Sequence, residues 1–413
     1  MLKKYTYLII LILVLTMTAC GKSEEVVLPT LVDIAELQTR NAPTLTPSTV
    51  PTATFPGPTL PPTYTPTPTL LPVTLTPTYT PISGEITGTI YYIYNNNAIA
   101  VMYGDGSQHE FIYSVSEGRT VRNLTLSPNG ELLAFVAPGN GSADEVWIMN
   151  RDGTYLQQIS CLGFNDLREL VWSPDGEWIS FFGAQKPGDP AGIYRATWIN
   201  ANSCPETQRQ LVDADSTTLG GLAYSPDGTK LFFSDETIYV LDLDTSEISE
   251  PLTETGGFGP DHSLQFNPEK TYLLVYLQSS ISVNSQITDG DYLVILSVAR
   301  IGGILEPETE LRTPIQKYQW SNDGSRLLIS TSTSVFIFNP GTGESNNVVT
   351  SAFLPPLAIY SPTNEQVAYI DKDPSISTLQ QIYVVKSNGA NPKQVTTHAE
   401  GIISDIIWAD GGW

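Results

Sequence analysis

The segment Val171-Trp-Ser-Pro-Asp-Gly176 recurs along the chain and decides the fold. Close copies are Ala223-Tyr-Ser-Pro-Asp-Gly228 and Thr125-Leu-Ser-Pro-Asn-Gly130. More distant copies begin at Gln265, Gln319, Ile359 and Ile407. Successive turns lie 40 to 54 residues apart, and each is surrounded by strand-forming sequence. A repeat of this length with this content is typical of the blades of a β-propeller.

The residues of the repeat fit a tight turn that follows an inner strand. Proline fixes φ at the first corner, aspartate bonds to its own backbone, and glycine adopts the positive φ that closes the hairpin. Two strand-rich runs follow, as in Glu131–Ala137 and Glu145–Met149. The aromatic residue before the turn is expected to pack between blades, and stacking on a ligand is the alternative. These aromatic residues are Trp172, Tyr224, Trp320, Tyr360 and Trp408.

The two ends of the repeat region complement each other. Three strands are expected at Gly88–Tyr94, Ala98–Tyr103 and His109–Tyr113, with no inner strand before them. The last turn copy has only a strand near Ser404–Trp408 and nothing after it. Pairing this C-terminal strand with the first blade would close the ring and remove open sheet edges. The sequence therefore predicts an all-β, seven-bladed propeller over residues 84–413, closed by the C-terminal strand.

The N-terminus has the features of an export signal. Lys3 and Lys4 precede the apolar run Tyr7–Val14, and Leu15-Thr-Met-Thr-Ala-Cys20 follows. This stretch resembles the bacterial lipobox, although Met17 stands where an aliphatic residue is usual. The resemblance implies a signal peptide over residues 1–19, lipidation of Cys20 and an extracytoplasmic chain anchored in the cell membrane. A plain membrane-spanning anchor is the alternative, but the run is shorter than the ~20 residues that a spanning helix needs.

The segment between the anchor and the repeats has a biased composition. Residues 42–82 contain 14 threonines and 12 prolines and no charged residue. Such a stretch cannot bury a core, and its prolines favour an extended polyproline chain. We therefore expect residues 20–83 to form a disordered Thr/Pro-rich tether.

The charge and the cysteine content indicate which partners and which redox compartment to expect for this chain. The formal net charge is −23, which repels nucleic-acid phosphates and anionic headgroups. We therefore expect no nucleic-acid partner, and membrane attachment through the lipid alone. Cys161 and Cys204 remain as an even pair in an oxidising compartment, which favours a disulfide. Their expected positions, near opposite faces of neighbouring blades, argue against it.

The repeat as a whole is similar to the TolB-type, WD40-like propeller repeat, with its Trp-Ser-Pro-Asp-Gly turn and its Ile-Tyr-Val strand before an Asp-Gly turn. The similarity covers nearly all of residues 84–413. It implies the fold but not one activity, because the same repeat serves TolB, which docks a lipoprotein, and also caps prolyl oligopeptidases and builds pectate-fragment lyases.

Residues with obvious chemistry are few. There is no Gly-x-Ser-x-Gly elbow, no His-Glu-x-x-His and no phosphate-binding glycine loop. Asp261, His262 and His398 are expected in connections that gather at one mouth of the channel, where a binding or metal site is the functional interpretation and solvated loops the structural one. His109 is expected in the outer part of the first blade, far from the other histidines. No catalytic residue, metal or cofactor is assigned.

Three functions follow from these features. The first is a monomeric, non-enzymatic module that binds or senses an envelope protein or a glycan through one propeller face and its long loops. The second is a carbohydrate lyase or hydrolase with a metal at the channel mouth. The third is a structural role in organising the envelope, like that of TolB.

Overall fold

The computed structural model of the chain describes residues 87–413, apart from residues 140, 142, 200–207, 213–218, 236, 250–263, 270–271, 279–280, 284–285, 289–290, 298–306, 313–314, 352–355 and 377. The described residues form strands, turns and loops, with no helix among them. Accordingly, no helix in this part of the chain is long and apolar enough to cross a bilayer. The signal peptide, Cys20 and the tether lie outside the described residues and stay predictions.

The first half of the described chain forms three four-stranded sheets and one three-stranded sheet. The first sheet runs β29-β1-β2-β3, with β29 at Ile403–Ala409, β1 at Thr89–Tyr94, β2 at Ala98–Tyr103 and β3 at Glu110–Ser114. The next contains β4 (Arg122–Leu126), β5 (Leu132–Pro138), β6 (Asp144–Asn150) and β7 (Gln157–Gln158). Then follow β8 (Asp166–Trp172), β9 (Trp178–Ala184), β10 (Gly192–Thr197) and β11 (Gln208–Val212), and after them β12 (Leu219–Tyr224), β13 (Lys230–Asp235) and β14 (Thr237–Asp242).

The second half adds three more four-stranded sheets and a hairpin. One sheet contains β15 (Leu264–Phe266), β16 (Tyr272–Gln278), β19 (Asp291–Ser297) and β20 (Pro307–Arg312), and the hairpin β17 (Ile281–Val283) and β18 (Gln286–Thr288) lies between β16 and β19 in sequence. The others are β21 (Ile315–Trp320), β22 (Leu327–Thr331), β23 (Ser334–Asn339) and β24 (Glu344–Thr350), and then β25 (Leu357–Tyr360), β26 (Gln366–Lys372), β27 (Gln380–Lys386) and β28 (Lys393–Gln394).

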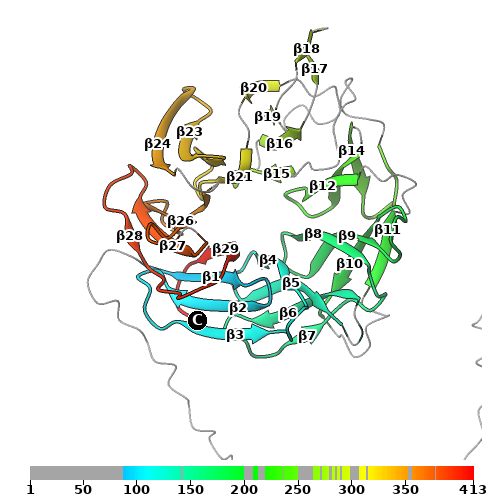
Figure 1. Cartoon of the computed structure of the whole chain (residues 1–413). Coiled ribbons are helices and arrows are strands. Elements are labelled where there is room, and N and C mark those ends of the chain that lie inside the picture. The colour runs from blue at the N-terminus through cyan, green and yellow to red at the C-terminus, as the bar shows by residue number, and fades with distance from the viewer. Residues whose placement is uncertain are drawn as a thin grey trace, which may run out of the picture. The chain divides into compact units, whose positions relative to one another are not determined.

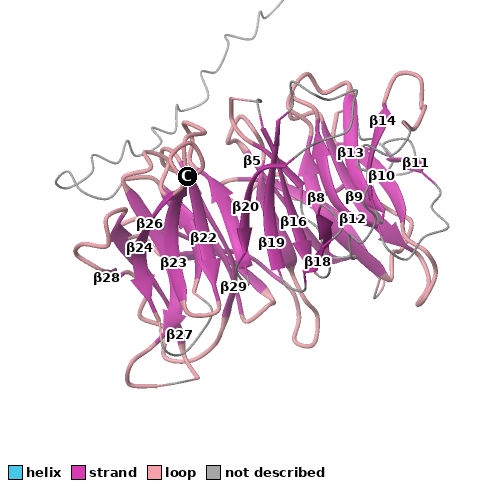
Figure 2. Cartoon of the chain, turned by 90° about the horizontal axis from the view of Figure 1, so that it is seen from above, coloured by secondary structure: helices cyan, strands magenta, loops and turns pink. Residues whose placement is uncertain are grey.

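These sheets are arranged radially around a central channel, as Figure 1 shows, and the view turned by 90° shows their strands side by side (Figure 2). The strand next to the channel is the first of each sheet in sequence, except in the first sheet, where it is β29. Neighbouring inner strands contact one another, for example β29 with β4 and β8 with β12. The all-β propeller architecture predicted from the repeat is confirmed.

The repeated turn forms as its residues predict. Gly176 has φ of 73° and Gly228 has φ of 75°, the left-handed region that favours glycine. Ser173 Oγ donates to Asp175 Oδ1 and accepts a hydrogen bond of 2.9 Å from the Trp178 backbone N–H. In the last complete copy Asn364 replaces the glycine and keeps a φ of 61°, because asparagine tolerates this region better than other residues.

Apolar side chains fill the spaces between neighbouring sheets. One core cluster joins the first sheet to the β25–β28 sheet through Ile90, Tyr92, Ile382 and Ile406. The predicted aromatic residues before the turns are all buried, with exposed fractions between 3% and 8%. Trp172, Tyr224, Tyr360 and Trp408 belong to clusters that join two sheets, as predicted. Among the described residues, the cluster of Trp320 lies within one sheet.

Ring closure by the C-terminal strand is also confirmed. β29 pairs antiparallel with β1, with Tyr91 opposite Ile407 and Ile90 opposite Trp408. The Thr89 hydroxyl donates to the carbonyl of Gly411 over 2.8 Å, and the Trp408 indole donates to the carbonyl of Thr87 over 3.0 Å. The connection between β16 and β19 contains the β17–β18 hairpin.

Candidate functional site

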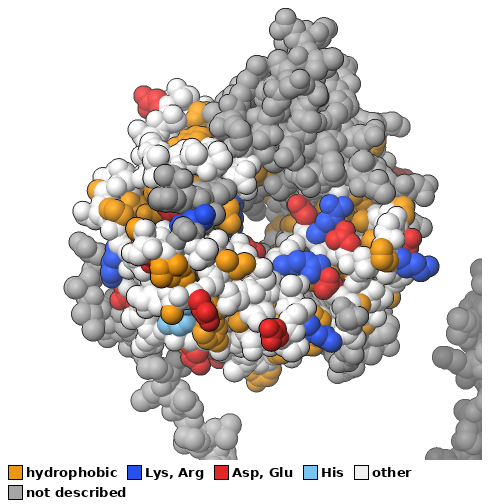
Figure 3. All heavy atoms as spheres, in the orientation of Figure 1, with side chains coloured by type: hydrophobic (Ala, Val, Ile, Leu, Met, Phe, Trp, Pro, Cys, Tyr) orange, Lys and Arg blue, Asp and Glu red, His pale blue; other side chains and the backbone are white. Residues whose placement is uncertain are grey.

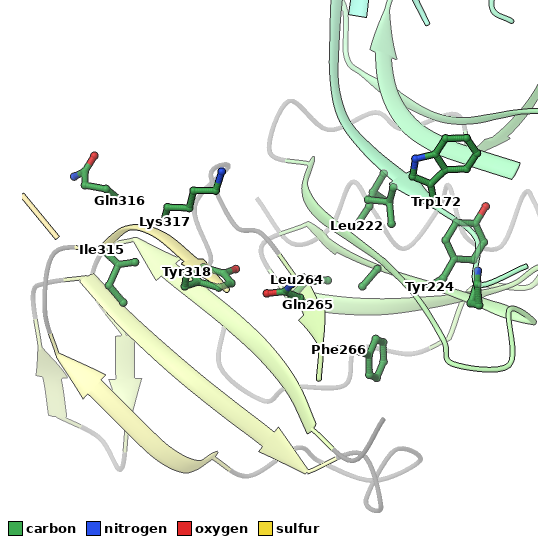
Figure 4. Close-up of a pocket in the computed structure, with 13 residues that line it drawn as sticks. Trp172, Leu222, Tyr224, Leu264, Gln265, Phe266, Ile315, Gln316, Lys317 and Tyr318 are labelled. Atoms are coloured by element: carbon green, nitrogen blue, oxygen red, sulfur yellow. The ribbon is translucent and has the colours of Figure 1, made fainter. Parts of the chain in front are cut away.

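A cavity opens at the inner strands, between β8 and β12 on one side and β15 and β21 on the other. Its volume is about 730 Å³, within the roughly 300–1,000 Å³ range of small-ligand sites. Figure 4 shows Trp172, Leu222 and Tyr224 facing the residues of β21 across this space. The lining residues are Val171, Trp172, Pro174, Leu222, Ala223, Tyr224, Leu264, Gln265, Phe266, Ile315, Gln316, Lys317 and Tyr318.

Two polar atoms in this lining are buried without a hydrogen-bond partner among the described residues. They are the indole Nε1 of Trp172 and the amide Oε1 of Gln265, one donor and one acceptor. Trp172 is only 7% exposed, so its indole N–H has little access to bulk water. Both atoms are shielded from solvent, so the surface that these two residues present to the cavity is formed by the rest of their side chains.

The cavity is otherwise apolar and aromatic. The Tyr224 hydroxyl is already engaged with Ser180 Oγ at 2.6 Å, which leaves the ring as its contribution to the lining. Burial raises the pKa of Tyr224 to about 12, although the hydrogen bond between Tyr224 and Ser180 acts to lower it, so the phenol is neutral at physiological pH. Aromatic faces with a few directed polar groups form a surface for ligands with both apolar and hydroxyl character.

One cation stands at the edge of the cavity. Lys317 of β21 reaches Asp405 of β29, with 3.5 Å between Nζ and Oδ1, although the two strands belong to different sheets. Asp405 Oδ2 also accepts a hydrogen bond of 3.1 Å from the Leu124 N–H. Lys317 is thus partly neutralised, and it links the cavity to the neighbouring inner strands. Figure 3 shows cationic and anionic side chains around the central opening.

A half-buried glutamate bonds the backbone of the same wall. Glu169 of β8 has a positive φ of 59° within a β-bulge, and its Oε2 accepts a hydrogen bond of 3.1 Å from the N–H of Leu222, a lining residue. Burial raises the pKa of this carboxyl to about 7, although the hydrogen bond from the Leu222 N–H and the positive charge of Arg168 both act to lower it. Asp405 bonds Leu124 in the same manner, so the contact recurs between neighbouring inner strands.

The predicted channel-mouth residues are only partly placed. Asp261 and His262 lie outside the described residues. His398 lies in the connection from β28 to β29, as expected, but its ring contacts Tyr92 and Tyr94 of β1, the second strand of its sheet. In Figure 3, histidine side chains (pale blue) appear away from the central opening.

The expectation that His109 lies far from the other histidines is wrong for His398. The ring centroids of the two residues are 5.4 Å apart, and both Nε2 atoms contact the hydroxyl of Tyr92. His109 does precede the outermost strand β3, as predicted. The sequence did not show that the connection between β28 and β29, which carries His398, brings this histidine next to His109 on the first sheet.

The cysteines stand as follows. Cys161 takes part in a disulfide, and it lies in the segment that follows β7. Cys204 lies outside the described residues, so the pairing of Cys161 with Cys204 stays a prediction. The lipidation of Cys20 is likewise a prediction.

Sequence reasoning missed the cavity itself, together with Gln265, Lys317 and Glu169. No departure from the repeat marks the cavity, because residues of the close copies, such as Val171, Trp172 and Tyr224, line it as well. The aromatic residues at Trp172 and Tyr224 were noted as possible stacking surfaces, and both line the cavity.

Comparison with known proteins supports the fold. No protein-family model and no curated protein sequence matches the chain. The periplasmic gluconolactonase PpgL of Pseudomonas aeruginosa has a similar structure, with a TM-score of 0.55 and 15% identity over 79% of this chain and 99% of that chain. A manganese complex of oligogalacturonate lyase aligns with a TM-score of 0.52 and 11% identity over 70% of this chain and 82% of that chain. Identities this low show a shared propeller fold and say nothing of activity.

The structural similarity to TolB is lower than the similarity to the gluconolactonase or to the lyase. TolB from Acinetobacter baumannii aligns over 79% of this chain and 81% of that chain, with 14% identity and a TM-score of 0.45. A TM-score of this size does not distinguish TolB from other propellers. The TolB-like character of the chain therefore rests on its repeated turn.

Proposed function

We propose that this chain is a glycan-binding module with a non-catalytic propeller, in which a sugar unit occupies the cavity between β8, β12, β15 and β21. The observation that carries the proposal is a cavity of about 730 Å³ whose lining includes the aromatic residues Trp172, Tyr224 and Tyr318. A sugar presents hydroxyl groups that donate and accept, beside C–H faces that pack on aromatic rings.

The charge of the molecule limits the kinds of glycan that we expect the cavity to bind. A net charge of −23 disfavours long acidic polymers, and the one cationic side chain of the lining, Lys317, is already paired with Asp405. We therefore favour a neutral or amino-sugar glycan as the ligand. An envelope protein bound through the loops of one face is the competing outcome of the experiment below.

The setting of this module is part of the proposal. A lipid at Cys20 and a tether over residues 20–83 would hold the propeller outside the cytoplasm at the cell membrane. The disulfide at Cys161 supports an oxidising compartment. We infer that the ring has seven blades, which the radial sheets and the repeated turns support, and we further propose that the chain acts as a monomer.

A binding screen with paired tryptophan variants tests the cavity. The full chain is screened against neutral, amino-sugar and acidic glycans, and the dissociation constant of any hit is measured by calorimetry. Trp172→Phe keeps an aromatic ring but reduces the aromatic surface on which a sugar packs, so the affinity should fall about two- to tenfold. Trp320→Phe is the matched control, because Trp320 occupies the equivalent repeat position, and its buried indole also lacks a partner but does not line the cavity.

The outcomes separate the candidate functions. Weakened binding in Trp172→Phe with unchanged binding in Trp320→Phe supports the cavity as the glycan site. Equal affinities in the wild-type chain and both variants would place the ligand elsewhere. If no glycan binds, and crosslinking in native envelopes captures one protein partner, the glycan proposal is wrong.

An enzyme acting on a bound glycan is the second candidate, and one observation favours it. Glu169 has a pKa raised by burial to about 7, suitable for a general acid or base, and it bonds the backbone of the lining residue Leu222. Glu169→Gln should then abolish product formation while leaving the dissociation constant of the glycan nearly unchanged. The recurrence of the same contact at Asp405 and Leu124 argues that the primary role of Glu169 is structural.

A further inference from the structure

A contact between two histidines and a tyrosine lies where the ring closes, away from the cavity. His109 Nε2 lies 2.5 Å from the hydroxyl oxygen of Tyr92, and His398 Nε2 lies 2.7 Å from the same oxygen. Tyr92 is in β1, His109 is in the connection between β2 and β3, and His398 is in the connection between β28 and β29. One hydroxyl group of a buried tyrosine therefore holds two connections that are far apart in the sequence.

The hydrogens in this contact require that at least one imidazole is neutral. The phenol has one hydrogen, so it donates to one imidazole nitrogen and accepts from the other. An imidazolium carries a hydrogen on both ring nitrogens and can only donate. When both histidines are protonated, the phenol hydrogen has no imidazole acceptor left, and two positive charges repel each other with ring centroids 5.4 Å apart. Double protonation therefore breaks the contact.

We propose that His109, Tyr92 and His398 form an acid-sensitive latch on the closure of the ring. At neutral pH the latch holds the β28–β29 connection against the first sheet. Protonation of both histidines releases this connection, which leads directly into the closing strand β29.

The direction of the pH dependence follows from the state of the two imidazoles. Partial burial lowers the pKa of His109, and burial together with the neighbouring His109 lowers the pKa of His398 to about 4. Their ordinary pKa, which applies when the connection is released, is 6.5. The released state binds more protons below this value, so the closure loses stability as the pH falls from about 6.5 towards 4 and is fully stabilised above that range.

Neighbouring phenols and carboxylates do not replace the histidines as the titrating groups. Tyr92 and Tyr94, whose rings contact the imidazoles, stay neutral because burial raises the pKa of both phenols. Glu110 and Glu400 flank the histidines in sequence, and the charge of Glu400 acts on Tyr94. In the described part of the chain, neither carboxylate forms an ion pair with a histidine.

The polar groups of the other adjoining segments are engaged elsewhere or carry no charge. Lys393 of β28 donates to the carbonyl of Asp105 over 3.2 Å, and Asp105 Oδ1 accepts from the Ser107 N–H over 2.9 Å. β27 contributes Gln381, which is uncharged and bonds both the N–H and the carbonyl of His398. The charge at the latch therefore depends on its two histidines.

Backbone hydrogen bonds beside the latch report whether the connection is in place. The Asn95 N–H donates to the carbonyl of Ile402 over 2.8 Å, and the Ile402 N–H donates to Asn95 Oδ1 over 3.0 Å. These two amides join the β1–β2 turn to the end of the connection. Their protection from hydrogen exchange should therefore fall when the latch opens.

A double variant with His109→Gln and His398→Gln tests the latch in the full chain. Glutamine is neutral at every pH used and keeps both a donor and an acceptor, so the closure should form without its pH dependence. Hydrogen exchange is measured at about pH 7.5 and about pH 4.5, with rates corrected for the intrinsic effect of pH. The protection of Asn95 and Ile402 should fall at least about tenfold at the lower pH in the wild type, and less than about twofold in the variant. Amides of the β22–β23 pair, in another sheet, are the internal control.

A titration of the imidazoles completes the experiment. The chain has three histidines, so ¹⁵N signals of His109 and His398 can be assigned with single glutamine variants. We expect His398 to titrate well below 6.5 in the folded chain, and protection to be lost over the same pH range. An equal loss of protection in the double variant would overturn the proposal, as would two histidines that titrate near 6.5. If the double variant does not fold, the wild type decides: protection that persists after both imidazoles are protonated contradicts the latch.

Discussion

Individual side chains tie the inner strands of neighbouring sheets to one another. Glu169 bonds the backbone of Leu222, Asp405 bonds that of Leu124, and Gln319 accepts a hydrogen bond of 2.8 Å from the Tyr360 N–H. Of these, Glu169 has its protonation state altered by the fold, because its surroundings disfavour the charged carboxylate. This local effect is measurable as a dependence of stability on pH.

Glu169 should make the chain less stable as the pH rises. The folded chain holds the carboxyl proton up to about pH 7, whereas the unfolded chain releases it near the ordinary pKa of 4.5. The folded state therefore binds more protons in this window, and the free energy of unfolding falls as the pH increases through it. Glu169→Gln removes this titration and retains an acceptor for Leu222. Urea unfolding at about pH 5 and about pH 8 should show that the variant gains stability over wild type at the higher pH. An equal difference at both pH values would contradict this assignment.

At the scale of single elements, the conformation of the repeated turn follows directly from its own residues. The side chain two residues after the serine accepts a hydrogen bond from that serine in four copies, through Asn129, Asp175, Asp227 and Asp323. The glycine at its end has a φ between 68° and 75° in the complete copies. Asn364 shows that asparagine can take its place.

Two substitutions at Gly176 test the need for the left-handed conformation. A Cβ at this position would meet only Pro128, at an ordinary distance of 3.8 Å, so the backbone conformation and not crowding sets the cost. Gly176→Ala should lower the free energy of unfolding by about 1–2 kcal/mol, the usual cost of the left-handed region for an L-residue. Gly176→Asn should cost clearly less, as at Asn364. Equal losses in the two variants, measured by chemical unfolding, would show that φ is not the cause.

At the scale of the whole molecule, the closing strand β29 joins the end of the chain to its first sheet. Ile406 is 1% exposed within the core cluster shared by these sheets, whereas Ile402, just before the strand, is 41% exposed. Both residues are isoleucines in the closing segment, so they form a natural pair for comparison.

Ile406→Ala should destabilise the chain by about 2–5 kcal/mol, because it removes buried methyl groups and leaves a cavity at the closure. Ile402→Ala should change the free energy of unfolding by less than about 0.5 kcal/mol, as expected for an exposed position. Thermal unfolding of both variants against wild type measures the difference. Comparable losses in both would mean that the closing strand does not bury the side chains assigned to it.

The sequence predicted the architecture because the turn residues act locally and repeat. The strands, the turn conformation and the closure by β29 followed from residues such as Pro174, Gly176 and Trp408, whose roles depend on their neighbours in sequence. The cavity and the His109–His398 contact depend on which connections fold over which sheet. No local pattern encodes that arrangement, so Gln265, Lys317 and the approach of His109 to His398 were not predicted.

The cavity beside Trp172 is the proposed ligand site, and the indole N–H signal of that residue reports directly on a ligand bound there. The full chain is labelled with ¹⁵N at its seven tryptophans, and the signals of Trp172 and Trp320 are assigned with their phenylalanine variants. Adding a glycan that binds should shift the Trp172 indole resonance and leave that of Trp320 in place, because only Trp172 lines the cavity. A saturating glycan that leaves the Trp172 resonance unchanged would contradict the account.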